Sequence, residues 1–255
     1  MFIPIGDDNQ DRRLTPIVNY FFIFLNIFVF IYFQNWGQDL QFTYAFATVP
    51  GEIISGHDII TQGQILQDPN TGQIVQFPGL QPTPVPVFLT LLSSMFMHGG
   101  IAHILGNMLF LWIAGDNVED AMGHTNYFFF YLICGILSGL SHVFVTYYFS
   151  QDLLTPSLGA SGAIAGILGA YIFLFPRKRV YIWLFFWFTI AVPAWIAVGL
   201  WFAFQVIDGL GMLGGRNSGN IAYGAHIGGF IAGLLLCKLF VQKRQDLPGK
   251  TKSFW

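Results

Sequence analysis

Residues 157–175, SLGASGAIAGILGAYIFLF, decide the fold. The stretch is apolar enough to enter a membrane, and an apolar helix of about 20 residues crosses a hydrocarbon core of roughly 30 Å. It nevertheless begins with a hydroxyl group, that of Ser161, and Gly162, Gly166 and Ala170 form a stripe of small residues beside it. A serine in such a run is commonly packing filler, so its role depends on the rest of the chain.

The composition of the whole chain is that of a membrane protein. Of its 255 residues, 54% are hydrophobic and 9% are charged, whereas about a quarter of the residues in a soluble domain are charged. Apolar runs long enough to span a membrane lie at about 16–34, 97–115, 127–149, 160–176, 180–207 and 220–241. The sequence therefore predicts an all-α fold, a polytopic membrane protein with a bundle of six transmembrane helices. We expect a single membrane-embedded domain over 1–255, with its core at about 16–241.

The positive charges predict the orientation of the chain. Arg12 and Arg13 precede the first span, residues 177–179 join spans four and five, and further basic residues follow the sixth span. With six spans these clusters share one face, which the positive-inside tendency makes cytoplasmic. Both termini, including the tail at 242–255, are then expected in the cytoplasm, and the first loop, 35–96, outside. The polar residues before the first span lack a small-residue cleavage site, so we expect that span to be retained. The net charge of −2 gives no reason to expect a nucleic-acid partner.

Three loop features carry their own expectations. Within the first loop, the alternating pattern of 63–77 on both sides of a Pro-Asn-Thr-Gly turn predicts a short β-hairpin. The surrounding polar insertion, about 56–82, has no function that the sequence indicates. Pro193 is expected to interrupt the fifth span, as a bend or a fixed kink. The glycine-rich stretch 209–219 is either a mobile cover or a plain linker.

Polar side chains in spans two, four and six are functional candidates, because such groups are costly inside a membrane. Span two supplies His98, His103 and Asn107, span four supplies Ser161, and span six supplies His226. His103 and Asn107 are four residues apart and share a helix face. Gly229 and Gly233 share the stripe of His226, so spans four and six are expected to pack backbone to backbone. Spans two, four and six all run from outside to inside, and His103, Ser161 and His226 each lie in the first turns of their helix. The topology therefore predicts that these side chains share one depth, near the outer side of the membrane.

The chemistry of these groups favours acyl transfer. A serine hydroxyl is a weak nucleophile until a base takes its proton, and histidine is the base that titrates near neutrality. The start of a helix offers free backbone N–H groups to an oxyanion beside Ser161, and Asn107 and His103 are further donors. No carboxylate lies near His226 in spans four or six, so packing or a neighbour that the sequence does not identify must orient it. Taken singly, each group has a structural alternative: helix packing for Ser161 and a hydrogen bond within the bundle for each of the others.

Three motifs together resemble the rhomboid family of intramembrane serine proteases. They are HGGIAHILGNMLFLW (98–112), GASGAIAG (159–166) and AHIGGFIAG (225–233), in this order over about 97–240. The resemblance implies Ser161 as nucleophile and His226 as general base, with Asn107, His103 and the backbone N–H of Ser161 around the oxyanion. It implies that the substrates are single-span or otherwise membrane-anchored proteins, cut within or beside their transmembrane helix. It implies neither a metal nor an organic cofactor.

The resemblance has two departures. Many members carry a Trp-Arg pair in the first loop, where this chain has Trp36 and no arginine, and some carry a tyrosine against the histidine ring where this chain has Ala165. The expected location is a prokaryotic plasma membrane, in contact with its lipid and with the active site opening to the outer side. The sequence does not predict an oligomeric state.

Four alternatives use the same features differently. A non-catalytic rhomboid-like protein would bind and escort membrane proteins, although such relatives usually lack the serine or the histidine. A metalloprotease would use His98, His103 and His226, but no carboxylate in these spans completes a site. We expect His98, at the edge of span two, to be structural or interfacial. Asp116 and Asp120 are a poor pair for an aspartyl protease, and a small transporter or channel remains the fourth alternative.

Overall fold

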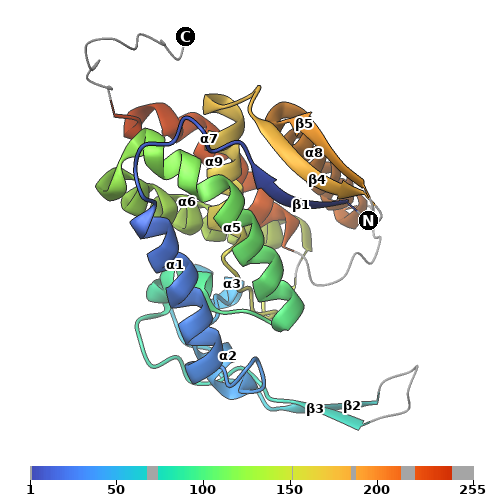
Figure 1. Cartoon of the computed structure of the whole chain (residues 1–255). Helices are drawn as coiled ribbons and strands as arrows, with labels where there is room; N and C mark the ends of the chain where they lie inside the picture. Colours follow the sequence, from blue (N-terminus) through green and yellow to red (C-terminus); the bar gives the residue numbers. More distant parts are fainter. Residues whose placement is uncertain (1, 68–73, 151, 185–187, 214–221, 243–255) are drawn as a thin grey trace.

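The computed structural model describes residues 2–67, 74–150, 152–184, 188–213 and 222–242 (Figure 1). The chain is mostly helical, as the apolar runs predict. Its long helices are α1 (Ile17–Phe28, continued by the π-helical turn η1, Val29–Phe33), α5 (Ile101–Met122), α6 (His124–Val145, continued by η4, Thr146–Ser150), α7 (Ser161–Leu174), α8 (Ala194–Leu213) and α9 (Tyr223–Phe240).

Three of the described helices are long and apolar enough to cross a membrane by themselves. They are Ile101–Met122, His124–Phe149 and Tyr223–Phe240. The apolar segments Ile17–Phe33 and Ser161–Leu174 are shorter. The helical membrane protein is therefore the part of the fold prediction that the structure supports, and the count of six spans stays a prediction.

Helix α7 lies inside the bundle and packs directly on α9. Every residue of α7 from Gly162 to Tyr171 is buried. A Cβ placed on Gly233 would lie 1.9 Å from the carbonyl oxygen of Gly166, and one on Gly229 would lie 2.2 Å from that of Gly162. Such distances leave no room for a side chain, so the two helices touch through their backbones. The stripes of small residues predict this contact, and the structure confirms it.

The first loop is partly ordered into short elements. The predicted hairpin in 63–77 is confirmed, because β2 (Gln64–Gln67) pairs antiparallel with β3 (Ile74–Phe77). Its expected turn lies outside the described residues. The other elements of the loop are α2 (Leu40–Phe46), α3 (Pro50–Ser55), η2 (Val87–Leu89), α4 (Thr90–Ser93) and η3 (Ser94–Phe96). At the bottom of Figure 1 the hairpin projects away from the helices.

The first loop is fastened to the segment that leads into α7. Thr48 and Ser157 exchange two backbone hydrogen bonds, of 3.0 and 2.8 Å. The Thr48 hydroxyl contacts the Ser94 hydroxyl at 2.8 Å, and the backbone N–H of Gly159 donates to the carbonyl of Ser94 at 2.9 Å. The segment just before Ser161 is thus held by backbone hydrogen bonds to two parts of the first loop, at Thr48 and at Ser94.

The fifth predicted span, 180–207, is wrong in its first part, and the all-α prediction is corrected to mostly helical. Strand β4 covers Arg179–Leu184, β5 covers Phe188–Pro193, and helix begins only at Ala194. The polar N-terminal head, for which the sequence analysis predicts no strand, supplies β1 (Phe2–Asp7), and the antiparallel order is β1-β4-β5. Periodicity does not separate an apolar strand from a buried helix. The run is rich in β-branched and aromatic residues, which favour strands.

Pro193 marks the change from strand to helix. The sequence predicts instead that it bends or kinks a helix, and this prediction is wrong. Pro193 is the last residue of β5, directly before the first residue of α8. Proline has no N–H for a sheet ladder and disrupts a helix interior, so the boundary is the position that tolerates it. The glycine-rich stretch 209–219 begins as helix, since α8 runs to Leu213. The role of cover stays a prediction, because 214–221 lie outside the described residues.

Acidic residues near the end of α5 hold the N-terminal segment. Asp116 pairs with the guanidinium of Arg12. Asp120 accepts hydrogen bonds of 2.9 and 2.8 Å from two backbone N–H groups that precede α1. Glu119, fully buried, accepts bonds of 3.0 and 2.7 Å from N–H groups in the first turn of α1. Glu119 therefore stabilises the N-terminus of α1, as negative groups do. Asp116 and Asp120 hold the segment just before it, which gives both carboxylates a structural role.

Asp7, at the end of β1, lies in a buried polar cluster beside α7. Its Oδ2 accepts hydrogen bonds from the Tyr171 hydroxyl at 2.5 Å and from Asn117 Nδ2 at 2.8 Å. Its Oδ1 is buried and has no hydrogen-bond partner among the described residues. Burial is the main cause that raises the pKa of Asp7 to about 7, and the nearby carboxylate of Asp116 adds to it, while Lys178 opposes it. The docking of β1 is therefore sensitive to pH.

An Asp7→Asn substitution should remove part of the pH dependence of stability. Between its ordinary pKa of 3.8 and about 7, Asp7 keeps a proton in the folded chain that the unfolded chain has lost. Stability then falls as pH rises through this window. Because asparagine does not titrate, the variant should gain about 2–4 kcal/mol relative to the native protein between pH 4 and pH 8. Free energies of unfolding in detergent measure this, and parallel curves for the two proteins would contradict it.

Candidate active site

Ser161 is the first residue of α7, presented by a tight turn. Gly159, two residues earlier, has φ of +126°, a backbone conformation that favours glycine. A Cβ at Gly159 would lie 3.0 Å from ring atoms of His103 and 3.6 Å from the Oγ of Ser161. The turn therefore brings the Ser161 hydroxyl and the His103 ring to the same point. Backbone N–H groups at the start of α7 have no partner within the helix.

His226 lies in the first turn of α9, and its side chain reaches Ser161. The distance from His226 Nε2 to Ser161 Oγ is 2.8 Å, that of a hydrogen bond. This approach follows from the packing described above: α7 and α9 touch through glycines, and each carries its polar residue near the start of the helix. The two residues are 65 positions apart in the chain.

The other nitrogen of His226 contacts a residue that the sequence analysis missed, Gln205 of α8. The distance from His226 Nδ1 to Gln205 Oε1 is 2.6 Å. An amide oxygen only accepts, so Nδ1 carries the proton and Nε2 is free to accept the hydrogen of Ser161. The Trp201 ring also lies near the imidazole, with 6.1 Å between ring centroids. The available signal was a lone amide in the apolar run LWFAFQVI, 200–207.

His103 and Asn107 lie one turn apart on α5. The His103 ring packs against Gly159, as described above, and its Nδ1 accepts a hydrogen bond from the N–H of Gly99 at 3.3 Å. Asn107 is buried, and its Nδ2 finds no hydrogen-bond acceptor in the part of the chain that the structure describes. A buried amide donor without an acceptor is unusual. The structure thus brings Ser161, His226 and His103 together and gives Asn107 an unused donor.

His98 is held by Gln34, which directly follows η1, and it packs against His103. Gln34 accepts a hydrogen bond from the His98 N–H at 2.8 Å and donates one to its carbonyl at 2.9 Å. The ring of His98 is fully buried and meets the His103 ring edge-on, with centroids 5.2 Å apart. Over the described ranges, no group of three His, Cys, Asp or Glu side chains is placed to hold a metal ion. Histidines 98, 103 and 226 therefore do not form a ligand set there.

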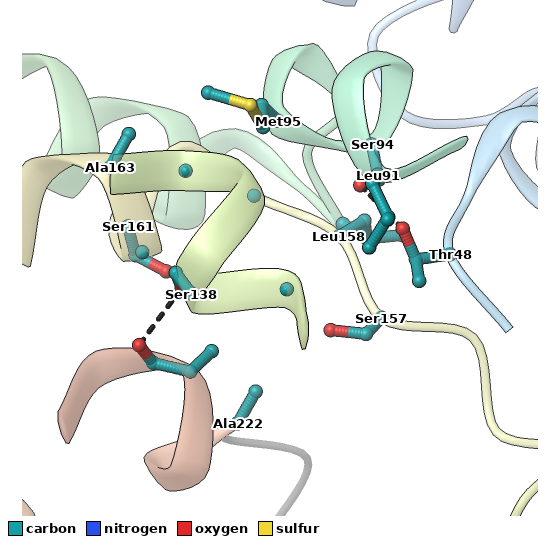
Figure 2. Close-up of a pocket in the computed structure, with 15 residues that line it drawn as sticks. Thr48, Leu91, Ser94, Met95, Ser138, Ser157, Leu158, Ser161, Ala163 and Ala222 are labelled. Atoms are coloured by element: carbon teal, nitrogen blue, oxygen red, sulfur yellow. Dashed lines mark hydrogen bonds between the residues drawn. The ribbon is translucent and has the colours of Figure 1, made fainter. Parts of the chain in front are cut away.

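A small cavity of about 30 Å³ borders Ser161. Figure 2 shows hydroxyl groups of Thr48, Ser94, Ser138 and Ser157 around it, and the dashed line marks the hydrogen bond from Ser138 to the carbonyl of Ala225. The cavity has room for about one or two water molecules, and hydroxyl groups are suitable partners for them.

Comparison with known proteins decides the family. A model of the rhomboid domain matches residues 86–243, more than half of the chain. The chain belongs to the rhomboid family. As a rhomboid, it is a membrane protein, in agreement with its apolar helices. The family relationship predicted from the three motifs is confirmed.

Related rhomboids come from several kingdoms. Rhomboid protein 1, mitochondrial, of Saccharomyces cerevisiae is 31% identical over 157 residues, which is 61% of this chain and 43% of the yeast protein. Rhomboid protease GluP of Bacillus subtilis is 37% identical over 136 residues, 53% of this chain and 25% of that protein. RHOMBOID-like protein 2 of Arabidopsis thaliana is 36% identical over 146 residues, 57% and 40% of the two chains. This chain therefore spans less than half the length of these relatives.

At one departure from the family pattern, this rhomboid supplies different contacts. Ala165, where some members carry a tyrosine, is fully buried and has no ring to offer His226. Gln205 and Trp201 of α8 contact the imidazole instead. At the other departure, Trp36 has a positive φ of 59° and is 53% exposed. In this rhomboid, α8 thus supplies contacts to the imidazole at a place other than position 165.

Proposed function

We propose that this rhomboid is an intramembrane serine endopeptidase that cleaves transmembrane or membrane-anchored proteins with Ser161 as nucleophile and His226 as general base. The observation that carries the proposal is the 2.8 Å contact between His226 Nε2 and Ser161 Oγ inside a helical membrane bundle. The 37% identity to a protein named as a rhomboid protease supports it. A serine hydroxyl gains nucleophilicity when an adjacent base accepts its proton.

The reaction then has two covalent stages. His226 Nε2 takes the proton of Ser161 as Oγ attacks the scissile carbonyl carbon, and the protonated imidazole passes that proton to the leaving amine as the C–N bond breaks. Water next attacks the resulting ester, giving its proton to His226, and the acid product leaves as Ser161 recovers its hydrogen. The hydroxyl-lined cavity beside Ser161 has room for this water.

The oxyanion of each stage is stabilised by donors around Ser161. We assign the backbone N–H at the start of α7, the side chain of Asn107 and the ring of His103 to this role. The unused Nδ2 of Asn107 and the contact between His103 and the turn at Gly159 support the assignment. Donors fixed in a site with little water stabilise such a charge more than water does.

An Asn107→Ala substitution should lower kcat by about 10²- to 10³-fold while leaving KM nearly unchanged, because the donor acts on the transition state. Turnover of a membrane-embedded reporter measures both constants. Asn126→Ala is the matched control: it removes a side-chain bond to the carbonyl of Phe240, at the far end of α9, and should leave kcat within about twofold. Equal kcat values for the two variants would remove Asn107 from the oxyanion site.

The arrangement in the membrane follows the charge pattern. We propose six spans, both termini in the cytoplasm, and an active site that opens to the outer side, where the first loop packs against the segment before α7. Single-span membrane proteins are the proposed substrates, since such a site reaches a peptide bond near the membrane surface. A prokaryotic plasma membrane is the proposed location, and the relatives include both a bacterial and a mitochondrial rhomboid.

The proposal is tested with the purified chain in lipid. A fluorophosphonate probe should label the native protein at Ser161 and leave the Ser161→Ala variant unlabelled. In a library of single-span proteins, fragments identified by mass spectrometry should appear with the native protein and be absent with the variant. Binding of library members without labelling or cleavage would indicate the non-catalytic alternative, and cleavage by the variant would overturn the proposed nucleophile.

A further inference from the structure

One face of helix α8 carries the amide of Gln205 toward α9, and the carboxylate of Asp208, three residues further on, lies near Tyr223 of α9. Trp201, Gln205 and Gly209 are four residues apart and so lie on one face of the helix. This face lies against the start of α9. Trp201 and Gln205 contact His226 of α9, and a Cβ placed on Gly209 would lie 3.2 Å from Tyr223 of α9. Of the three residues on this face, Gln205 is thus the one that offers His226 a hydrogen-bond acceptor.

Another face of α8 is exposed within the chain. Leu200, Phe204, Ile207 and Leu210 are 56%, 60%, 60% and 62% exposed within the chain. Next to the Gln205 contact, the Phe202 ring stacks on Phe230 of α9, with 4.1 Å between centroids. The contacts of α8 with the bundle therefore lie on the side that carries Phe202 and Gln205, together with the buried Ala194 and Val198.

We propose that Gln205 is the positioning residue of the catalytic base: by accepting a hydrogen bond from His226 Nδ1–H it fixes the ring and its tautomer, and it does so only while α8 lies against α9. This inference rests on the proposed function of the Ser161–His226 pair. Without Gln205, the imidazole has two tautomers available, and one of them places a hydrogen on Nε2, where Ser161 needs an acceptor. The base is then competent only when three helices, α7, α8 and α9, are assembled.

Two substitutions separate hydrogen bonding from packing. Gln205→Leu keeps the approximate volume and removes the acceptor, and it should slow fluorophosphonate labelling of Ser161 by about 10- to 100-fold, the effect of leaving a buried donor without a partner. Gln205→Glu keeps an acceptor and should retain labelling within about threefold at its optimum. Because a carboxylate favours the imidazolium, the acidic limb of its pH profile should move to higher pH by about one unit.

The small probe makes the readout specific to the base. It needs no helical substrate to be positioned, so the rate of labelling reports the serine and its base. The other titratable groups that face His226 are His103 on α5 and His142 on α6. Both histidines are present in every variant. A difference between the pH profiles of the Gln205→Glu variant and the native protein is therefore caused by the substitution at position 205.

A double-mutant cycle tests the dependence on α8. Phe202→Ala weakens the α8–α9 contact without touching His226, and it should slow labelling in the native background by about fivefold or more. In the Gln205→Leu background it should slow labelling no further. Phe204→Ala, on the exposed side of α8, is the control and should leave both rates unchanged.

The outcomes distinguish the two proposals. If native protein is neither labelled nor active, the proposed function fails. If native protein is labelled but Gln205→Leu labels at the native rate, or if the Glu variant shows the native pH profile, Gln205 is not the positioning residue. If Phe202→Ala slows both backgrounds equally, competence of the base does not depend on α8 through Gln205.

Discussion

Alanine at Ser161 or at His226 is expected to reduce cleavage of a membrane-embedded substrate by at least about 10⁴-fold, while the protein stays folded and inserted in the membrane. Without Ser161 there is no nucleophile to form the acyl-enzyme. Without His226 the hydroxyl keeps its proton, because the distance of 2.8 Å makes His226 Nε2 the acceptor for it. Neither residue carries the packing of α7 on α9, which glycines provide.

The double variant Ser161→Ala/His226→Ala should be no less active than either single variant, since the two side chains act as one unit. Initial rates of reporter cleavage in lipid give the three activities. Ser141→Ala is the matched control, because its hydroxyl donates to the carbonyl of Gly224, at the start of α9, and not to His226. Additive losses would mean that Ser161 and His226 act separately, and an active His226→Ala variant would mean that another base serves Ser161.

Gly233→Ala should destabilise the protein and abolish activity although it lies two turns from the dyad. The added Cβ would sit 1.9 Å from the carbonyl oxygen of Gly166. That oxygen belongs to helix backbone and cannot turn aside, so α9 must move away from α7. Overpacking usually costs about 1–3 kcal/mol, and a backbone clash of this kind belongs at or above the upper end. The same displacement should carry His226 away from Ser161.

Thermal midpoints in detergent and fluorophosphonate labelling measure the two effects separately. The control is Gly106→Ala in α5, where an added Cβ meets no other atom within 4 Å among the described residues. It should be neutral or slightly stabilising, since alanine favours helix over glycine. A Gly233→Ala protein with native stability and labelling would show that α7 and α9 do not depend on backbone contact.

The sequence predicts the parts of this molecule that follow from local chemistry. Apolar length places helices near most of the expected spans, and the stripes of glycine predict the α7–α9 contact, because only residues without bulky side chains allow backbones to touch. The alternating residues around a turn predict the hairpin of β2 and β3. The meeting of Ser161 and His226 at one depth follows from the direction of the helices that carry them.

Other features depend on partners far away in the chain. Residues 179–193 are as apolar as a span, and they form strands through the pairing of β4 with β5 and of β4 with the distant β1. The distant partner, β1, is a short segment followed directly by polar residues, so the sequence gives only a weak strand signal there. Gln205 could be singled out as an amide in an apolar helix, but its contact with His226 requires the register of α8 on α9. Such registers are tertiary properties that no local pattern contains.

The pairing of β1 with β4 has a consequence for biogenesis. Phe2–Asp7 is synthesised well before its partner strand, Arg179–Leu184, which follows only after the long helices α1, α5, α6 and α7. Closing a contact over so many residues is slow compared with forming local helices. In a nascent chain, β1 therefore stays without its partner strand until β4 has been synthesised, and during that time it is exposed to chaperones, proteases and other chains.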